Sequence, residues 1–100
     1  MYYIYILYSV TADRYYVGHT DNVERRLNEH NASDRLTFTA KHRPWKLYAV
    51  FECSIVRNEA LKMERFIKRQ KSRRLIQRMI DGNKLQGKLA QLVRVPHVRD

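Results

Sequence analysis

Residues 2–31, YYIYILYSVTADRYYVGHTDNVERRLNEHN, contain two strand patterns and one helix pattern in direct succession. Tyr and Ile crowd residues 2–9, a composition that favours a strand, and the lack of clean alternation predicts burial on both faces. A turn then breaks the run, and residues 15–19 form a second short strand. Because neighbouring strands joined by a short turn usually pair, we expect an antiparallel hairpin. Tyr5 should lie roughly opposite Tyr16, with both side chains on one face.

The segment after this hairpin predicts a basic helix. Gly18 ends the second strand, either as a bend in which only glycine fits or as a gap that lets a ligand phosphate approach the backbone. Asp21 is expected to cap a helix that runs to about His30. Arg26 lies four residues before His30, so the two side chains are neighbours on one flank, with His19 just before the helix. This group of basic side chains is suited to bind an anion. The alternative is that these side chains form an ordinary solvated surface of the helix.

The remaining sequence predicts one more strand and two more helices, separated by polar turns. Helical spacing places Ala60, Met63 and Ile67 on one apolar stripe. We expect a polar loop at 31–43, a strand at 47–53, a helix at 56–70 capped by Ser54 or Asn58, and a helix that Ser72 caps and that ends at 81–83.

These patterns predict an α+β fold, a small three-stranded sheet, antiparallel or mixed, with helices against it. We expect one domain over residues 1–83, followed by a basic C-terminal tail over residues 84–100. Gly87 weakens a short helix in this tail, and the chain should be loose from Arg94 onwards.

The composition indicates a protein that binds polyanions. The formal net charge is +10 over 100 residues, and 44% of the residues are hydrophobic, enough for one core. The single cysteine, Cys53, has no internal disulfide partner and is expected to be a buried thiol in a reducing cytoplasm. We expect no signal peptide, and no apolar run approaches the roughly 20 residues that a membrane span needs.

The second half of the chain concentrates positive charge around one carboxylate. Between Lys62 and Arg78, Glu64 is the only acidic residue. Glu64 lies at the margin of the apolar stripe, which suits either a metal ligand or an ordinary ion pair with Lys68 or Lys62. The candidate nucleic-acid contacts in this region are Lys62, Lys68, Arg69, Lys71, Arg73 and Arg74.

The ordered set of motifs resembles the GIY-YIG nuclease domain over about residues 2–80, most closely in its small stand-alone bacterial form and more distantly in the N-terminal nuclease domain of UvrC. The matching elements are Tyr3-Ile4-Tyr5, Tyr16-Val17-Gly18, Arg26, His30 and Glu64 in MERFIK. Tyr3 replaces the first glycine and Val17 an isoleucine. His19 stands where UvrC-like members have lysine, which implies a phosphate contact or a proton carrier. The asparagine that UvrC-like domains carry beyond the glutamate has no clear match.

The resemblance implies a three-stranded antiparallel sheet flanked by helices and a divalent-metal phosphodiesterase. One Mg²⁺ or Mn²⁺ would be held by Glu64 and waters, while Arg26 would clamp phosphate oxygens. Tyr16 is assigned as the base that activates water and Tyr5 as its partner, with His19 or His30 taking the proton. The expected reaction is metal-dependent hydrolysis of DNA, structured or branched, in repair or recombination.

Other functions stay open at this point. A non-catalytic nucleic-acid-binding module would keep the fold and the basic surface, and the missing asparagine favours it. RNA remains open as a partner beside DNA, and no membrane partner is expected. A protein–protein adaptor that uses exposed tyrosines and the segment 85–95 fits the net charge least well.

Overall fold

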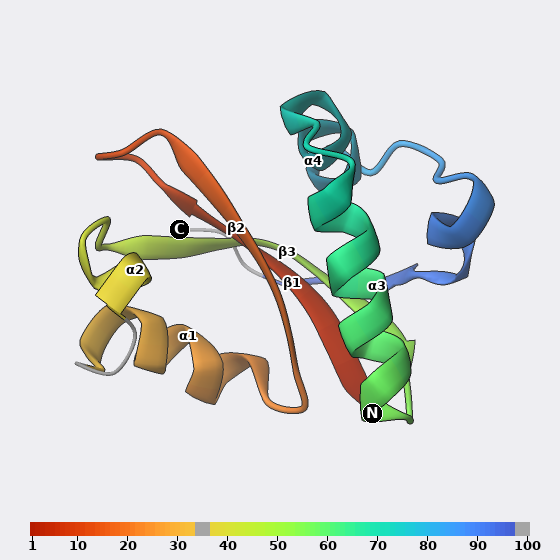
Figure 1. The fold of residues 1–100 in the computed structure, drawn as a ribbon, viewed down its shortest axis with the longest axis horizontal. Coiled ribbons are helices and arrows are strands. Elements are labelled where there is room, and N and C mark those ends of the chain that lie inside the picture. Colours follow the sequence, from red (N-terminus) through yellow and green to blue (C-terminus); the bar gives the residue numbers. More distant parts are fainter. Residues whose placement is uncertain (34–36, 98–100) are drawn as a thin grey trace.

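A four-stranded antiparallel sheet forms the centre of the computed structural model, which describes residues 1–33 and 37–97. Its strands are β1 (Tyr2–Ser9), β2 (Arg14–Thr20), β3 (Trp45–Ser54) and β4 (Val93–Arg94), in the spatial order β2-β1-β3-β4 (Figure 1). The helices are α1 (Val23–Ala32), α2 (Thr37–Ala40), α3 (Arg57–Arg69), α4 (Arg73–Ile80) and the 3₁₀ helix η1 (Gly87–Gln91). The predicted α+β class with an antiparallel sheet and flanking helices is therefore confirmed.

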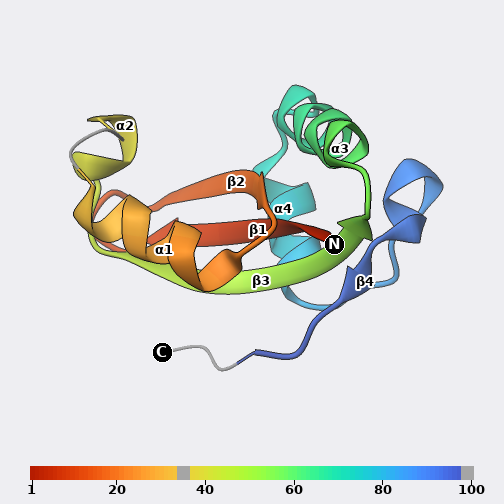
Figure 2. The same cartoon turned by 90° about the horizontal axis from the view of Figure 1, so that it is seen from below.

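Alternating side chains of β1 build two separate cores on the two faces of the sheet. Ile4 and Ile6 are fully buried and belong to the larger core, under α3 and α4. Tyr5 and Leu7 point the other way, toward α1, and pack with Trp45. Figure 2 shows α1 and α3 on opposite sides of the twisted sheet. Burial on both faces explains why β1 lacks a polar–apolar alternation.

The hairpin register differs from the expected one by two residues. Tyr5 pairs with Gly18, and Tyr16 pairs with Leu7, because a turn over residues 10–13 joins Ser9 to Arg14 as the last pair. A shift of two residues keeps every side chain on its face. Tyr5 and Tyr16 therefore still share a face, as predicted, and Gly18 lies inside β2 rather than at its end.

The expected sheet of three strands is corrected to four by the C-terminal segment. The two residues of β4 pair with Phe51 and Glu52 of β3. A two-residue strand carries no periodicity, so no sequence pattern reveals it. Arg94, expected to begin a loose end, donates hydrogen bonds to the carbonyls of Met79, Ile80 and Tyr48.

Residues after position 83 also contribute to the larger core. Leu89 and Leu92 are buried there, and the main-chain N–H of Val95 donates to the carbonyl of Val50. The division of the chain at residue 83 stays a prediction. Within the described residues, no helix has both the length and the apolar character to cross a membrane.

The helix boundaries correct several expected caps. Asn22, not Asp21, caps α1, where its side chain accepts a hydrogen bond from the main-chain N–H of Arg25. Val56 precedes α3 without a side-chain cap, so neither Ser54 nor Asn58 fills that role. Ser72 caps α4 as predicted, accepting from the N–H of Leu75. The short helix α2 lies inside the segment that was expected to be a loop.

Candidate active site

A hollow of about 470 Å³ opens beside β2, the edge strand of the sheet. Side chains from both faces of the sheet reach it, because β2 has β1 as its one neighbouring strand among the described residues. Tyr5, Tyr16 and Arg26 come from the α1 side, whereas His19 and Glu64 come from the α3 side. The full lining is Tyr2, Tyr5, Tyr16, His19, Thr20, Asp21, Arg25, Arg26, Glu29, Arg57 and Glu64.

Gly18 makes room for Tyr5 at the base of this hollow. A Cβ atom at Gly18 would lie 2.3 Å from the Tyr5 hydroxyl oxygen and 2.5 Å from Cζ. The backbone of Gly18 is not in the left-handed region, so no conformational freedom is needed there. The predicted bend at the end of a strand is wrong, because Gly18 lies inside β2, whereas a close approach of phosphate stays a prediction. The missing side chain of Gly18 lets the Tyr5 ring lie across the neighbouring strand.

His30 supports Tyr5 from behind and does not line the hollow. Its side chain is fully buried, and Nε2 lies 2.8 Å from the Tyr5 hydroxyl oxygen. Burial, and then the positive charge of Arg26, lower the pKa of His30 to about 4. Burial also raises the pKa of Tyr5, which Arg26 opposes only in part. At neutral pH both groups are therefore uncharged.

The surroundings of the second ring nitrogen, Nδ1, indicate the tautomer of His30. His30 Nδ1 is buried and has no hydrogen-bond partner within the described structure. An orphaned N–H is rarer in protein interiors than an acceptor with a free lone pair. This favours the hydrogen on Nε2, which then donates to the Tyr5 hydroxyl oxygen. Tyr5 keeps its own hydrogen for another acceptor.

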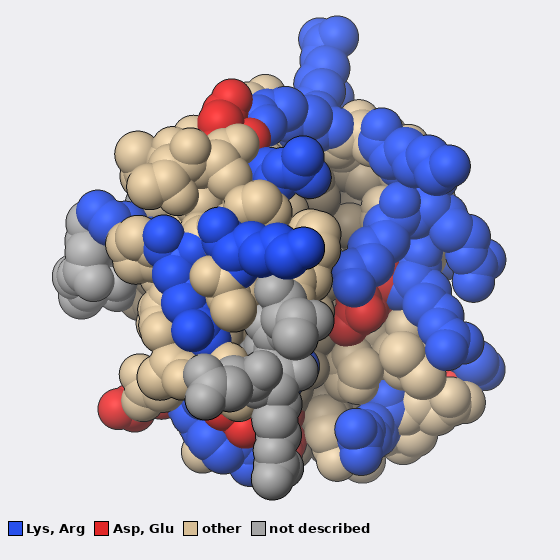
Figure 3. Space-filling view, turned by 60° about the vertical axis from the view of Figure 1, so that its left-hand side comes forward, with Lys and Arg blue, Asp and Glu red and all other residues tan. Residues whose placement is uncertain are grey.

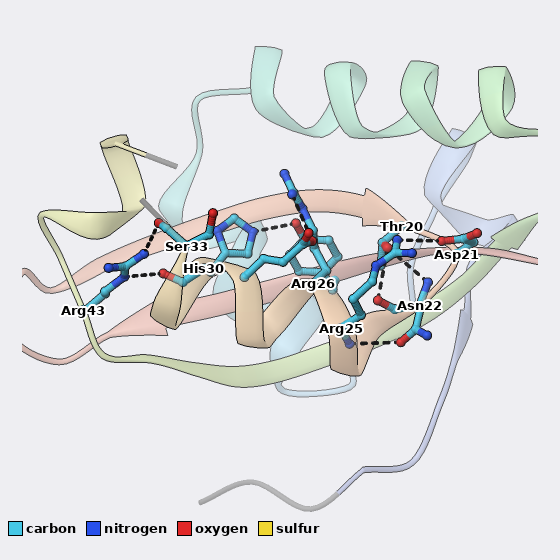
Figure 4. A network of polar contacts seen from close by, with 10 residues as sticks. Thr20, Asp21, Asn22, Arg25, Arg26, His30, Ser33 and Arg43 are labelled. Carbon is cyan, nitrogen blue, oxygen red and sulfur yellow. Dashed lines mark hydrogen bonds and ion pairs between the residues drawn. The ribbon is translucent and has the colours of Figure 1, made fainter. Parts of the chain in front are cut away.

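Figure 4 shows how α1 presents Arg26 and His30 on one flank, toward the sheet. The Arg26 side chain is 30% exposed and lies 3.3 Å from Glu29, one turn along the helix. Arg43 donates to the carbonyls of His30 and Ser33 and so holds the C-terminal end of α1. The spacing of four residues correctly predicted the shared flank, although His30 is buried rather than solvated.

Tyr16 lies between the two halves of the site. Its ring centroid is 4.7 Å from that of His30 and 6.3 Å from that of Tyr5. Lys68 places its ammonium nitrogen 5.0 Å from the Tyr16 ring centroid. Tyr16 therefore has an aromatic cluster on one side and a positive charge on the other.

Both carboxylate oxygens of Glu64 have partners. Oε1 lies 2.7 Å from His19 Nδ1, and Oε2 lies 2.9 Å from Lys68 Nζ. Burial pushes the pKa of Glu64 upward, but the hydrogen bonds from His19 and Lys68 together hold it below the ordinary value. The expected ion pair with Lys68 exists, while Lys62 lies 3.8 Å from Glu59 instead. Glu64 is thus both paired and open to the hollow.

The predicted nucleic-acid contacts on α3 and α4 differ in their surroundings. Figure 3 shows Lys and Arg side chains gathered along the right-hand side of that view. Arg73 binds the Asp13 side chain and lies over the Tyr15 ring at 4.9 Å, so it ties α4 to the hairpin turn. The other five predicted nucleic-acid contacts are all exposed, namely Lys62, Lys68, Arg69, Lys71 and Arg74.

Sequence reasoning missed two arginines of the hollow, Arg25 and Arg57. Arg57 lies seven residues before Glu64, a spacing that puts both side chains on one face of a helix. That spacing was a usable signal. No sequence signal identified Arg25. Its neighbour Arg26 has the same charge, and the helical periodicity alone does not show which of the two faces the hollow.

Comparison with known proteins places this site in a family. The model of the GIY-YIG catalytic domain matches residues 1–78. The UPF0213 protein HQ_3675A of Haloquadratum walsbyi is 37% identical over 84 residues, covering 81% of this chain and 92% of the relative. The UPF0213 protein BLi00048/BL00536 of Bacillus licheniformis is 33% identical over 85 residues, covering 85% and 84%.

Proposed function

The chain belongs to the GIY-YIG catalytic domain family, and from this premise we propose that it is a divalent-metal-dependent endonuclease acting on DNA. Membership of this family implies nuclease activity in general and a nucleic-acid substrate. The proposal adds DNA over RNA, one Mg²⁺ or Mn²⁺ ion, and a structure-selective role in repair or recombination in the cytoplasm. One observation carries it: Tyr5, Tyr16, Arg26 and Glu64 come from four different elements and line one hollow.

The residues of the hollow fit a hard divalent cation better than a softer metal. Among the described residues, no three His, Cys, Asp or Glu side chains are grouped to hold a metal ion. Asp21 and Glu29 also line the hollow but pair with Arg25 and Arg26, so the proposed ligand is the single carboxylate of Glu64. Mg²⁺ keeps several waters and takes its other ligands from phosphate oxygens, so one carboxylate suffices. When bound, the ion supplies charge stabilisation for the oxygen that leaves phosphorus.

The two tyrosines have different proposed tasks. Tyr5 stays protonated, because burial raises its pKa, and it donates its hydrogen bond to the phosphate or to the attacking water. Tyr16 is the proposed base: its hydroxyl group would pass its own proton to His19 as it takes the proton of this water. Lys68 lies over the Tyr16 ring and places a positive charge beside that proton transfer.

Arginines and His19 complete the proposed mechanism. Arg26 and Arg57 reach the hollow from α1 and α3, and the planar guanidinium fork suits two phosphate oxygens at once. His19 orients Glu64 through its Nδ1–H, which leaves Nε2 as the nitrogen that accepts a proton. The exposed basic side chains on α3 and α4 would hold more distant phosphates.

The test replaces Glu64 by its uncharged isostere. Glu64→Gln should lower the rate of plasmid nicking in Mg²⁺ by roughly 100-fold or more, since the metal contributes several kcal/mol to the transition state. Glu59→Gln is the matched control, because Glu59 lies on the same helix, outside the hollow. The substrates are supercoiled plasmid, single strands, flaps and junctions, each with Mg²⁺, with Mn²⁺ and with EDTA.

The far-ultraviolet circular dichroism spectrum should be the same for all three proteins. Metal-dependent cleavage that survives in folded Glu64→Gln would show that the metal assignment is wrong.

A non-catalytic nucleic-acid-binding module is the second candidate, and one observation favours it. His19 and Lys68 already occupy both oxygens of Glu64. A divalent cation at Glu64 would have to share this carboxylate with both groups, beside the positive charge of Lys68, whereas a binding module has no such requirement. Binding that weakens steeply with salt, without metal-dependent nicking of any substrate, would support this function.

A further inference from the structure

A second hollow, of about 460 Å³, adjoins the candidate active site. Tyr16 lines both hollows, and Lys68, which binds Glu64, lines the second one. The volume lies within the roughly 300–1,000 Å³ of pockets that bind small ligands. A ligand here would therefore contact Tyr16, which the two hollows share.

Phe38 is the aromatic side chain with its surface available in this second hollow. It is 54% exposed, and its ring meets His42 edge-on, at 78° and 5.5 Å. The other two aromatic rings of the lining have cations over them, Arg73 over Tyr15 and Lys68 over Tyr16. A flat ligand entering the hollow would therefore stack on Phe38.

Positive side chains surround this aromatic surface. Lys68, Lys71 and Arg14 line the hollow and are exposed. Lys71 has a φ of 47°, a left-handed conformation that glycine adopts without strain after a helix. A lysine at this position adds charge where the backbone would favour glycine. An exposed aromatic ring among cations matches the base and phosphate of a nucleotide.

We propose that the second hollow binds an unpaired nucleobase of a DNA strand, stacked on Phe38, next to the phosphate held in the first hollow. Its position beside the cleaved phosphate rests on the proposed nuclease function. Bases of an intact duplex are stacked inside it and do not reach Phe38 without being unpaired. The protein should therefore prefer single-stranded or frayed positions.

The experiment measures binding without cleavage, in EDTA, by fluorescence anisotropy. One probe is an oligothymidylate of about 12 nucleotides, within the usual range of single-strand sites. The other is an abasic strand of equal length, with the same phosphates and no bases. Wild type should bind the oligothymidylate about tenfold more tightly than the abasic strand, the effect expected of one stacked base.

Phe38→Ala should reduce this preference to about twofold or less, while Phe38→Trp should keep it. Val93→Ala is the control for loss of an exposed apolar side chain, since Val93 is 58% exposed and lies outside the hollow. The control should keep the full preference. Equal affinity of wild type for both probes, or an unchanged preference in Phe38→Ala, would overturn the base site.

These outcomes separate the base site from the nuclease function. Metal-dependent nicking together with equal affinity for both probes would leave the nuclease standing and remove the base site. A Phe38-dependent preference without nicking of any substrate would leave the base site and remove the nuclease. Stronger binding of an uncharged aromatic peptide than of the oligothymidylate would show that the hollow serves a protein partner and would also overturn the proposal.

Discussion

Gly18→Ala should disturb the candidate active site by adding one carbon atom to it. The added Cβ would lie 2.3 Å from Oη, 2.5 Å from Cζ and 2.9 Å from Cε1 of Tyr5, whereas ordinary contacts begin at 3.4 Å. Tyr5 is only 1% exposed, so its ring has little space into which to retreat. Any retreat also stretches the 2.8 Å hydrogen bond between Tyr5 and His30.

The expected loss of stability has two parts. Forcing an extra carbon into a packed interior costs about 1–3 kcal/mol. Separating Tyr5 from His30 leaves buried polar atoms unpaired, which costs about 1–3 kcal/mol more. Gly18→Ala should therefore lower the free energy of unfolding by roughly 2–6 kcal/mol. In a domain of this size, each kcal/mol lowers the Tm by about 4–8 °C.

Urea unfolding of single and double variants measures this coupling. Tyr5→Phe removes the hydroxyl but keeps Cζ and Cε1, so Gly18→Ala should remain costly in that background. Tyr5→Leu removes all three crowded atoms, and the penalty of Gly18→Ala should then disappear. It should even reverse slightly, because alanine is favoured over glycine in a strand by roughly 0.5–1 kcal/mol.

The opposite result would be an equal loss of stability on Gly18→Ala in wild type and in Tyr5→Leu. Such a result would place the crowding elsewhere than at Tyr5. A change below about 0.5 kcal/mol in the wild-type background would also refute the predicted clash, since surface substitutions have effects of that size.

Two other substitutions test the buried histidine and the C-terminal strand. The pKa of His30 falls from 6.5 to about 4 on folding, so the unfolded chain binds the extra proton and stability falls as pH drops from about 6.5 to about 4. This shift amounts to about 3 kcal/mol of stability. In urea titrations between pH 7 and pH 4, the free energy of unfolding of His30→Phe should therefore fall by about 3 kcal/mol less than that of wild type. Parallel pH profiles of the two proteins would contradict the low pKa of His30. Arg94→Ala removes donors to three main-chain carbonyls and should cost about 2 kcal/mol. Hydrogen exchange at the Val95 amide should accelerate more than in the exposed control Arg69→Ala, and equal rates would show that Arg94 does not hold β4.

Local patterns predicted most of the elements. Tyr- and Ile-rich composition identified β1, and apolar spacing identified α3 and its stripe of Ala60, Met63 and Ile67, all of which are buried. The cap at Ser72 was also correct. These features depend on residues a few positions apart, whose interactions persist in any fold that contains the segment.

The fourth strand and the role of Gly18 were not predictable in the same way. Arg94 binds main-chain carbonyls 14, 15 and 46 residues away, and a carbonyl acceptor has no sequence signature. Gly18 is explained by its partner Tyr5 across the hairpin, which requires the register. The prediction was wrong by two residues there, so the contact could not be inferred.

The candidate site divides along the same line. The sequence alone established which chemistry-bearing residues are present and in what order, namely two tyrosine half-motifs, Arg26, His30 and Glu64. The tertiary structure decided that His30 lies behind Tyr5, that His19 and Lys68 hold Glu64, and that both faces of the sheet meet at β2. Composition and spacing report interactions between residues that are one or two helical turns apart in the sequence. Convergence at an edge strand depends instead on register, sheet order and packing between segments that are distant in sequence.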